Sequence, residues 1–212
     1  FKDGNNTVGH AHLDLGTFIL DWFGKRWAME LGPDNYSLPG YFDDKRWNYL
    51  RLKTEGQNCF VIEGENQNRE AIAPVVSFKK GSNYFATINL SEAYKSRVEE
   101  ATRTFFVKNR KGHKAVIVSD LLTLKMPVPA SWNMYTKADI EITDGGRRAK
   151  LSYPDLEQKI ALQLIKPDSA RFNVSDLKLE KPFIKSDGVR KLSIRVMNPK
   201  KYLPFEVRFE AE

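Results

Sequence analysis

The sequence predicts an all-β protein, a large antiparallel β-sandwich of the supersandwich type with few or no helices. Three observations predict it: apolar and polar residues alternate with a period of two along most of the chain, turn-forming residues separate the alternating runs, and no segment has the length and period of a helix that would cover a sheet. Because sheets without covering helices must cover each other, we expect two packed sheets.

Ten alternating runs are short and rich in β-branched and aromatic residues, which is typical of strands. In chain order they are residues 18–20 with Trp22, 60–62, 75–78, 84–88, 102–107, 115–118, 138–142, 160–165, 192–196 and 205–209.

Turn chemistry separates these runs and predicts hairpin connections. The turns are Lys-Gly-Ser at 80–82, Arg-Lys-Gly at 110–112, Asp-Gly-Gly at 144–146 and Ser-Asp-Gly at 186–188. The one stretch with helical character, 91–100, is too short and leads directly into a strand, so we expect a loop or a single helical turn there. No repeat, linker or low-complexity tract divides the chain, which predicts a single domain over residues 1–212.

Composition and charge exclude several classes. The chain has 212 residues, of which 41% are apolar and 29% charged, and this excludes a disordered, collagenous or coiled-coil protein. The net charge of +7 favours an anionic partner: nucleic acid, an acidic polysaccharide or a bacterial surface. Nucleic acid is disfavoured because the basic residues are scattered and no zinc-finger or RNP-type motif accompanies them.

The chain contains neither a disulfide pair nor a membrane segment by sequence. Its single cysteine, Cys59, has no second thiol to pair with, and no apolar run approaches the roughly 20 residues of a membrane helix. The first residue is Phe1 rather than Met, so we expect a chain processed or cut from a longer protein.

Two of the three histidines, His10 and His12, stand in the segment Gly-His-Ala-His-Leu-Asp at 9–14. If this segment is extended, both imidazoles lie on the same face. A strand uses that spacing to offer one imidazole to a metal and the other to a substrate.

Four ordered blocks in the first third of the chain carry a family resemblance. They are His-Ala-His-Leu-Asp at 10–14, Gly-Thr-Phe at 16–18, Trp-Ala-Met-Glu-Leu-Gly at 27–32, and Gln-Asn at 57–58 before an apolar strand. Together they resemble the opening of the C-terminal domain of the heparinase II/III-like polysaccharide lyases. The rest of the chain agrees with that family only in being rich in strands.

The resemblance implies the sandwich half of a two-part enzyme. In that family an N-terminal α/α toroid supplies the substrate cleft and part of the catalytic apparatus, and this chain contains no run of amphipathic helices that would form one. By the same resemblance, His10 corresponds to the active-site histidine, and a tyrosine after Gly32 serves as acid or base. Tyr41 is our first choice for it and Tyr36 the second. Arg51 and Asn58 are the predicted substrate-binding residues.

The resemblance also implies a structural zinc site formed by His12, Glu30 and Gln57. A glutamate in place of the family's aspartate keeps an anionic oxygen ligand. A glutamine in place of histidine offers zinc a poor amide oxygen. We therefore expect zinc to be absent or weakly bound, with three alternatives: an empty site, a weaker metal, or hydrogen bonds from Glu30 and Gln57 that satisfy His12.

These expectations combine into a function. The chain is predicted to be the β-sandwich part of a bacterial, periplasmic or secreted polysaccharide lyase that cleaves an acidic, uronic-acid-containing glycan by β-elimination. Without its toroid it should be inactive. The alternative is a non-catalytic carbohydrate-binding or structural sandwich. An encoded toroid upstream favours the lyase, whereas a start codon just before Phe1 favours the binding module.

Overall fold

The computed structural model describes residues 1–110 and 113–212, which form two main antiparallel sheets and two short ribbons. The strands are β1 (Gly4–Asn5), β2 (Leu20–Trp22), β3 (Lys25–Ala28), β4 (Phe60–Ile62), β5 (Ile72–Ala73), β6 (Val75–Lys79), β7 (Tyr84–Asn89), β8 (Val98–Arg110), β9 (His113–Leu124), β10 (Ala130–Thr136), β11 (Asp139–Thr143), β12 (Arg148–Ser152), β13 (Ile160–Lys166), β14 (Phe172–Asp176), β15 (Arg190–Val196) and β16 (Tyr202–Ala211). The short 3-10 helices are η1 (Asp44–Asn48), η2 (Thr54–Gly56), η3 (Glu92–Tyr94) and η4 (Asp144–Gly146).

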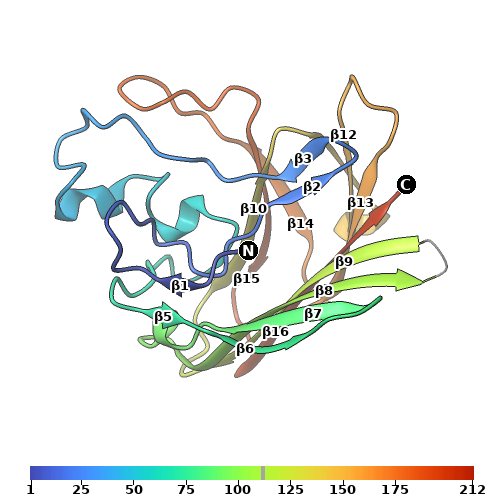
Figure 1. The fold of residues 1–212 in the computed structure, drawn as a ribbon, viewed down its shortest axis with the longest axis horizontal. Helices are drawn as coiled ribbons and strands as arrows, with labels where there is room; N and C mark the ends of the chain where they lie inside the picture. Colours follow the sequence, from blue (N-terminus) through green and yellow to red (C-terminus); the bar gives the residue numbers. More distant parts are fainter. Residues whose placement is uncertain (111–112) are drawn as a thin grey trace.

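The larger sheet has eight strands in the order β11-β12-β13-β16-β9-β8-β7-β6, and its long strands cross the lower part of Figure 1. Alternation places one face of each strand inside. In β16, for example, Leu203, Phe205, Val207 and Phe209 are buried, whereas Arg208 between two of them is exposed.

The smaller sheet has four strands in the order β14-β15-β10-β4. Trp132 and Met134 of β10 and Leu192 and Ile194 of β15 are fully buried and share one core cluster with the inner residues of β16. The two sheets therefore cover each other, and the predicted antiparallel β-sandwich is confirmed.

Most local predictions agree with these elements. Each predicted run overlaps a strand, the turns at 80–82 and 144–146 connect β6 to β7 and β11 to β12, and η3 is the single helical turn within 91–100. Positions 111 and 112 of the third predicted turn lie outside the described residues. The turn at 186–188 is a correction: β14 and β15 pair with each other, but a loop over 177–189 connects them instead of a tight hairpin.

The sequence predicted neither β10, β12 and β14 of the main sheets nor the short strands β1, β3 and β5. In β12, Ala149 and Leu151 are buried between half-exposed Arg148 and Lys150, so a period-two signal was present. It was weak because charged residues hold the outer positions.

Residues 1–59 are mostly loops with the short strands β1 to β3 and the helices η1 and η2, coloured blue to cyan in Figure 1. A buried arginine on β8 fastens them to the larger sheet. Arg103 binds the carboxylate of Asp120 on β9 through Nε (2.6 Å) and Nη2 (2.8 Å). Its Nη1 donates to the carbonyl oxygens of Gly16 (2.7 Å) and Asn58 (2.6 Å). No helix in the described part of the chain is long and apolar enough to cross a membrane.

Candidate functional site

Four aromatic side chains from two loops meet in the region formed by residues 1–59 of the chain. The ring centroid of His10 lies 5.7 Å from that of Phe42 and 6.5 Å from that of Tyr36. Tyr36 in turn lies 4.9 Å from Tyr41. We call His10, Tyr36, Tyr41 and Phe42 the His10 cluster. The structure thus brings together the three residues that the sequence singled out for catalysis.

The loop carrying Tyr36 and Tyr41 is shaped by its own sequence. Gly40 has a φ of 68°, a left-handed conformation that glycine adopts without strain, and a Cβ there would run into the Asp43 carboxylate. That carboxylate accepts a hydrogen bond from the Lys45 backbone N–H (2.8 Å) and caps η1. On η1, Arg46 donates through Nη2 to the Ala11 carbonyl oxygen (2.7 Å). This bond ties η1 to the segment between the two histidines.

The two histidines differ in exposure. His10 lies in a turn with a φ of 64° and is exposed, so the segment is not extended there and the same-face geometry expected for His10 and His12 does not hold. His12 is half-buried. His10 is therefore the histidine that faces solvent beside the tyrosines.

The two tyrosines also differ, and in the opposite order to the sequence ranking. Tyr36 is 55% exposed, whereas Tyr41 is 3% exposed. The Tyr41 hydroxyl oxygen accepts a hydrogen bond from the Asp34 backbone N–H (3.2 Å), and burial raises the pKa of Tyr41. Of the two, Tyr36 therefore has the hydroxyl that a substrate can reach.

Arg51 and Asn58 have structural partners in place of a substrate. The buried Arg51 guanidinium donates to the carbonyl oxygens of Leu31, Ile184 (3.1 Å) and Lys185 (3.1 Å). Asn58 is fully buried and donates to the carbonyl oxygens of Phe18 and Met29. Both side chains hold loops together, and this geometry gives no support to the substrate-binding roles predicted for them.

The residues predicted for a metal do not fit zinc. The Gln57 Nε2 donates to the Arg51 carbonyl oxygen (2.8 Å), and its buried Oε1 has no hydrogen-bond partner among the described residues. Glu30 is exposed. Burial, followed by the charges of Lys2 and Arg46, lowers the pKa of His12 to about 4, and positive charges beside a neutral imidazole also disfavour a bound cation. Among the residues described, no three His, Cys, Asp or Glu side chains gather in a way that could hold a metal ion.

Comparison with known proteins shows which solved structures share this fold. No protein-family model and no curated protein matches the sequence. Solved structures do match: the heparan sulfate lyase HepC from Pedobacter heparinus, with a TM-score of 0.76 and 15% identity over 95% of this chain, and the heparinase III BT4657 gene product, with a TM-score of 0.77 and 14% identity over 100%. The chain has a heparinase-like β-sandwich fold. It spans about a third of the solved chains it matches, 31% of the first and 32% of the second.

Sequence reasoning missed Phe42 of the His10 cluster and three residues that shape the surroundings of this cluster. Arg46 ties the histidine segment to η1, and Lys2 forms an ion pair with Asp14 near His12. The Asp34 Oδ1 accepts a hydrogen bond from the Ile184 backbone N–H (2.7 Å). None of these roles has a local pattern, because each partner is distant in the sequence.

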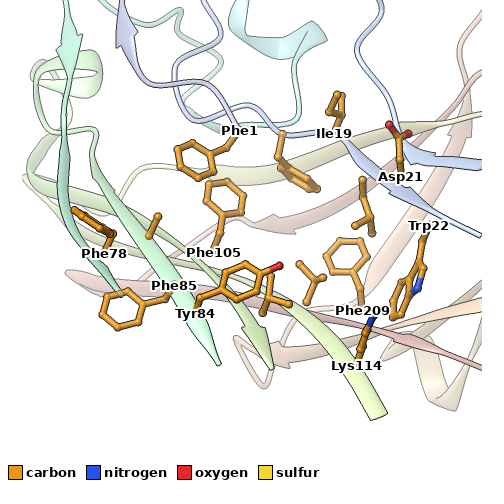
Figure 2. A pocket seen from close by; sticks show the side chains of 15 residues that line it. Phe1, Ile19, Asp21, Trp22, Phe78, Tyr84, Phe85, Phe105, Lys114 and Phe209 are labelled. Carbon is orange, nitrogen blue, oxygen red and sulfur yellow. The ribbon is translucent and has the colours of Figure 1, made fainter. Parts of the chain in front are cut away.

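A separate apolar cavity of about 480 Å³ lies between the larger sheet and the β2 segment. Figure 2 shows its lining, which includes Phe1, Trp22, Phe78 and Phe85. The ring of Phe1 stacks on that of Phe105 with centroids 4.8 Å apart. The only charged side chains of the lining are Asp21 and Lys114, so the cavity offers little acid–base chemistry, and the His10 cluster remains the candidate site of this heparinase-like fold.

The first prediction from this geometry concerns metal. We expect the purified 212-residue chain to contain much less than one zinc per molecule, because one imidazole with an amide and an exposed carboxylate is a poor donor set. Adding a chelator should leave its melting temperature unchanged. Elemental analysis and thermal unfolding measure both. One tightly held zinc per chain, with a melting temperature that falls on chelation, would show that Gln57 can be a ligand.

The second prediction concerns pH. Because the folded pKa of His12 is about 4 against an ordinary value of 6.5, the unfolded chain binds a proton that the folded chain does not bind between these values. The stability associated with neutral His12 is complete above pH 6.5 and decreases as the pH falls towards 4. We expect the urea midpoint of the wild type to drop more between pH 7 and pH 5 than that of His12→Gln.

The carboxylate nearby does not confound this comparison. Burial raises the pKa of Asp14, so protonation of Asp14 stabilises the folded chain as the pH falls, which is the opposite of the effect of His12. Asp14 is also present in both proteins. Equal drops in the two urea midpoints would show that His12 is not the titrating group.

Proposed function

We propose that this chain is the β-sandwich half of a bacterial polysaccharide lyase that cleaves an acidic, uronic-acid-containing glycan by β-elimination. The observation that carries the proposal is the meeting of His10 and Tyr36 in one solvent-facing cluster on a heparinase-like sandwich. The similarity of the fold to a heparan sulfate lyase and to heparinase III supports the reaction class.

The reaction needs three groups. One neutralises the uronate carboxylate so that the C5 proton becomes acidic, a base removes that proton, and an acid protonates the departing glycosidic oxygen. The C5–H and C4–O bonds break, a C4–C5 double bond forms, and no water enters the product. His10 and Tyr36 bring an imidazole and a phenol to the same place, both of which transfer protons.

The third group is proposed to come from an N-terminal α/α toroid in the longer protein. Arg51 and Asn58, the polar candidates for carboxylate binding on this chain, already bind backbone carbonyls. The 212 residues alone should therefore bind glycan without cleaving it. Because the polymer lies outside the cytoplasm, we propose a periplasmic or secreted location, which cell fractionation tests.

The ultraviolet absorbance of the unsaturated uronate product tests the function. Heparin, heparan sulfate, hyaluronan and alginate are incubated with the 212-residue chain and with the longer protein that includes a toroid. We expect product from at least one glycan with the longer protein and none with the chain alone. Turnover by the chain alone, abolished in His10→Ala, would contradict the division of the active site between two domains.

One observation favours a second candidate, a non-catalytic carbohydrate-binding sandwich. The geometry of Gln57 shows a donor set that does not fit the zinc site implied by the family resemblance. A sandwich that has kept its fold but lost its catalytic activity would show such a change. Absence of product from all four glycans with the longer protein, together with retained glycan binding, would favour this candidate.

A further inference from the structure

The outer face of the smaller sheet carries a polar groove of about 610 Å³, a volume within the range of ligand pockets. Trp132 and Met134 of β10 and Leu192 of β15 point into the core. Because neighbouring residues of a strand point to opposite faces, Asn133 and Ser193 point outward. The groove shares no residue with the His10 cluster, so a ligand bound here goes beyond the proposed reaction.

The groove floor is a ladder of hydrogen-bonding side chains. Asn133 on β10 pairs in register with Ser193 on β15, which pairs with Asn173 on β14, and all three line the groove. Neighbouring strands lie about 4.8 Å apart. Each amide offers both a donor and an acceptor, which suits a ligand with several hydroxyl groups.

The buried and unpaired side-chain amide of Asn133 is the feature that points to a ligand. Its side chain is 1% exposed, and neither Oδ1 nor Nδ2 has a hydrogen-bond partner in the described part of the chain. Buried amides without partners are rare in native proteins because leaving them unpaired costs free energy. A ligand hydroxyl that enters the groove would supply the missing partner.

Two cationic side chains, Lys191 and Arg195, line the groove together with these polar residues. Lys191 lies 3.5 Å from the Glu55 carboxylate, and burial first, then neighbouring cations including Arg195, lower the pKa of Lys191. Arg195 lines the groove and has no ion-pair or hydrogen-bond partner for its side chain within residues 1–110 and 113–212.

The acidic side chains of the groove do not cancel the charge of Arg195. The Glu55 carboxylate is shared between Lys191 and Lys53 (2.7 Å), and the Glu63 carboxylate is bound by Arg97 (2.7 Å), which also binds Glu65. A guanidinium without a partner beside an amide ladder therefore suits a ligand with both hydroxyls and a carboxylate or sulfate.

We propose that this groove binds one unit of an anionic saccharide, with Asn133 and Asn173 on its hydroxyls and Arg195 and Lys191 on its carboxylate or sulfate. A single-stranded nucleic acid fits less well, because the lining contains no aromatic side chain on which a base would stack.

The test follows the side-chain amide resonances of Asn133 and Asn173 in the 212-residue chain during titration with a heparan sulfate hexasaccharide. We expect both amides to shift, with cellohexaose, a neutral probe, shifting them far less. Arg195→Gln and Asn173→Ala should each weaken binding about tenfold or more. Arg208→Gln on the larger sheet, the same change of charge at an exposed position, should leave the affinity unchanged. Asn133→Leu should weaken binding while keeping the melting temperature.

Three results would overturn the proposal. Unshifted Asn133 amide resonances would show that the ligand does not bind this amide and that water is its partner. Equal binding of cellohexaose would show that the charge of Arg195 does not contribute to binding. Tighter binding of a single-stranded DNA oligonucleotide would make the groove a nucleic-acid site. The amide resonances report on the groove alone. A failed lyase assay would therefore not contradict glycan binding in the groove, and absence of binding in the groove would not contradict the lyase activity.

Discussion

Arg103→Met is expected to lower the free energy of unfolding by about 3–5 kcal/mol. Arg103 and Asp120 are both fully buried and joined by two hydrogen bonds. Without the guanidinium, a carboxylate is left in the core with no counter-charge. The carbonyl oxygens of Gly16 and Asn58 lose their donor as well, which loosens the N-terminal segment that leads to the histidines. Urea unfolding at neutral pH measures the loss.

Two controls separate this ion pair from ordinary surface pairs. Arg26 and Asp21 are also doubly hydrogen-bonded, but their side chains are 53% and 54% exposed, so Arg26→Met should cost less than about 1 kcal/mol. The double variant Arg103→Met/Asp120→Leu should recover much of the lost stability, because an apolar pair leaves no buried charge. A loss of under about 1 kcal/mol in Arg103→Met alone would contradict this account.

His10→Ala in the longer protein is expected to lower turnover by a factor of about 100 to 10,000, the usual contribution of a general acid or base. Tyr36→Phe should give a comparable loss, because its exposed hydroxyl lies beside His10. Tyr41→Phe should change turnover little, since its hydroxyl is buried and only accepts a hydrogen bond from the Asp34 N–H. Initial rates of product formation measure all three.

Thermal unfolding provides the control for these variants. His10 and Tyr36 are exposed, so their substitution should leave the melting temperature unchanged, and a loss of activity then reports on chemistry. If Tyr41→Phe abolishes turnover and Tyr36→Phe does not, the ranking made from the sequence is right and the one made from the structure is wrong.

The sandwich could be predicted from sequence because its signal is local. Strands such as β16 alternate buried residues with half-buried or exposed ones from Tyr202 to Glu210, and alternation needs no knowledge of the partner strand. β10 was missed although Ala130, Trp132 and Met134 alternate with Ser131 and Asn133. Reading that alternation would have found the strand and the polar residues on its outer face.

The site could be predicted only in part, because its geometry depends on contacts between distant segments. The resemblance identified His10 and two tyrosines, but exposure decides between Tyr36 and Tyr41. That exposure depends on how the loop is anchored, for instance by the Ile184 N–H that binds Asp34 across 150 positions of the sequence. The turn at His10, with its positive φ, likewise has no signal in a His-x-His spacing.

The mass of the cleavage products tests the central proposal most directly. The longer protein is incubated with its preferred acidic glycan, and the fragments are analysed by mass spectrometry. β-Elimination predicts a new non-reducing end that is unsaturated and one water lighter than the same end in a hydrolysis product. A new non-reducing end with the full mass of a saturated uronate would show hydrolysis and would contradict the assignment of this sandwich to a lyase.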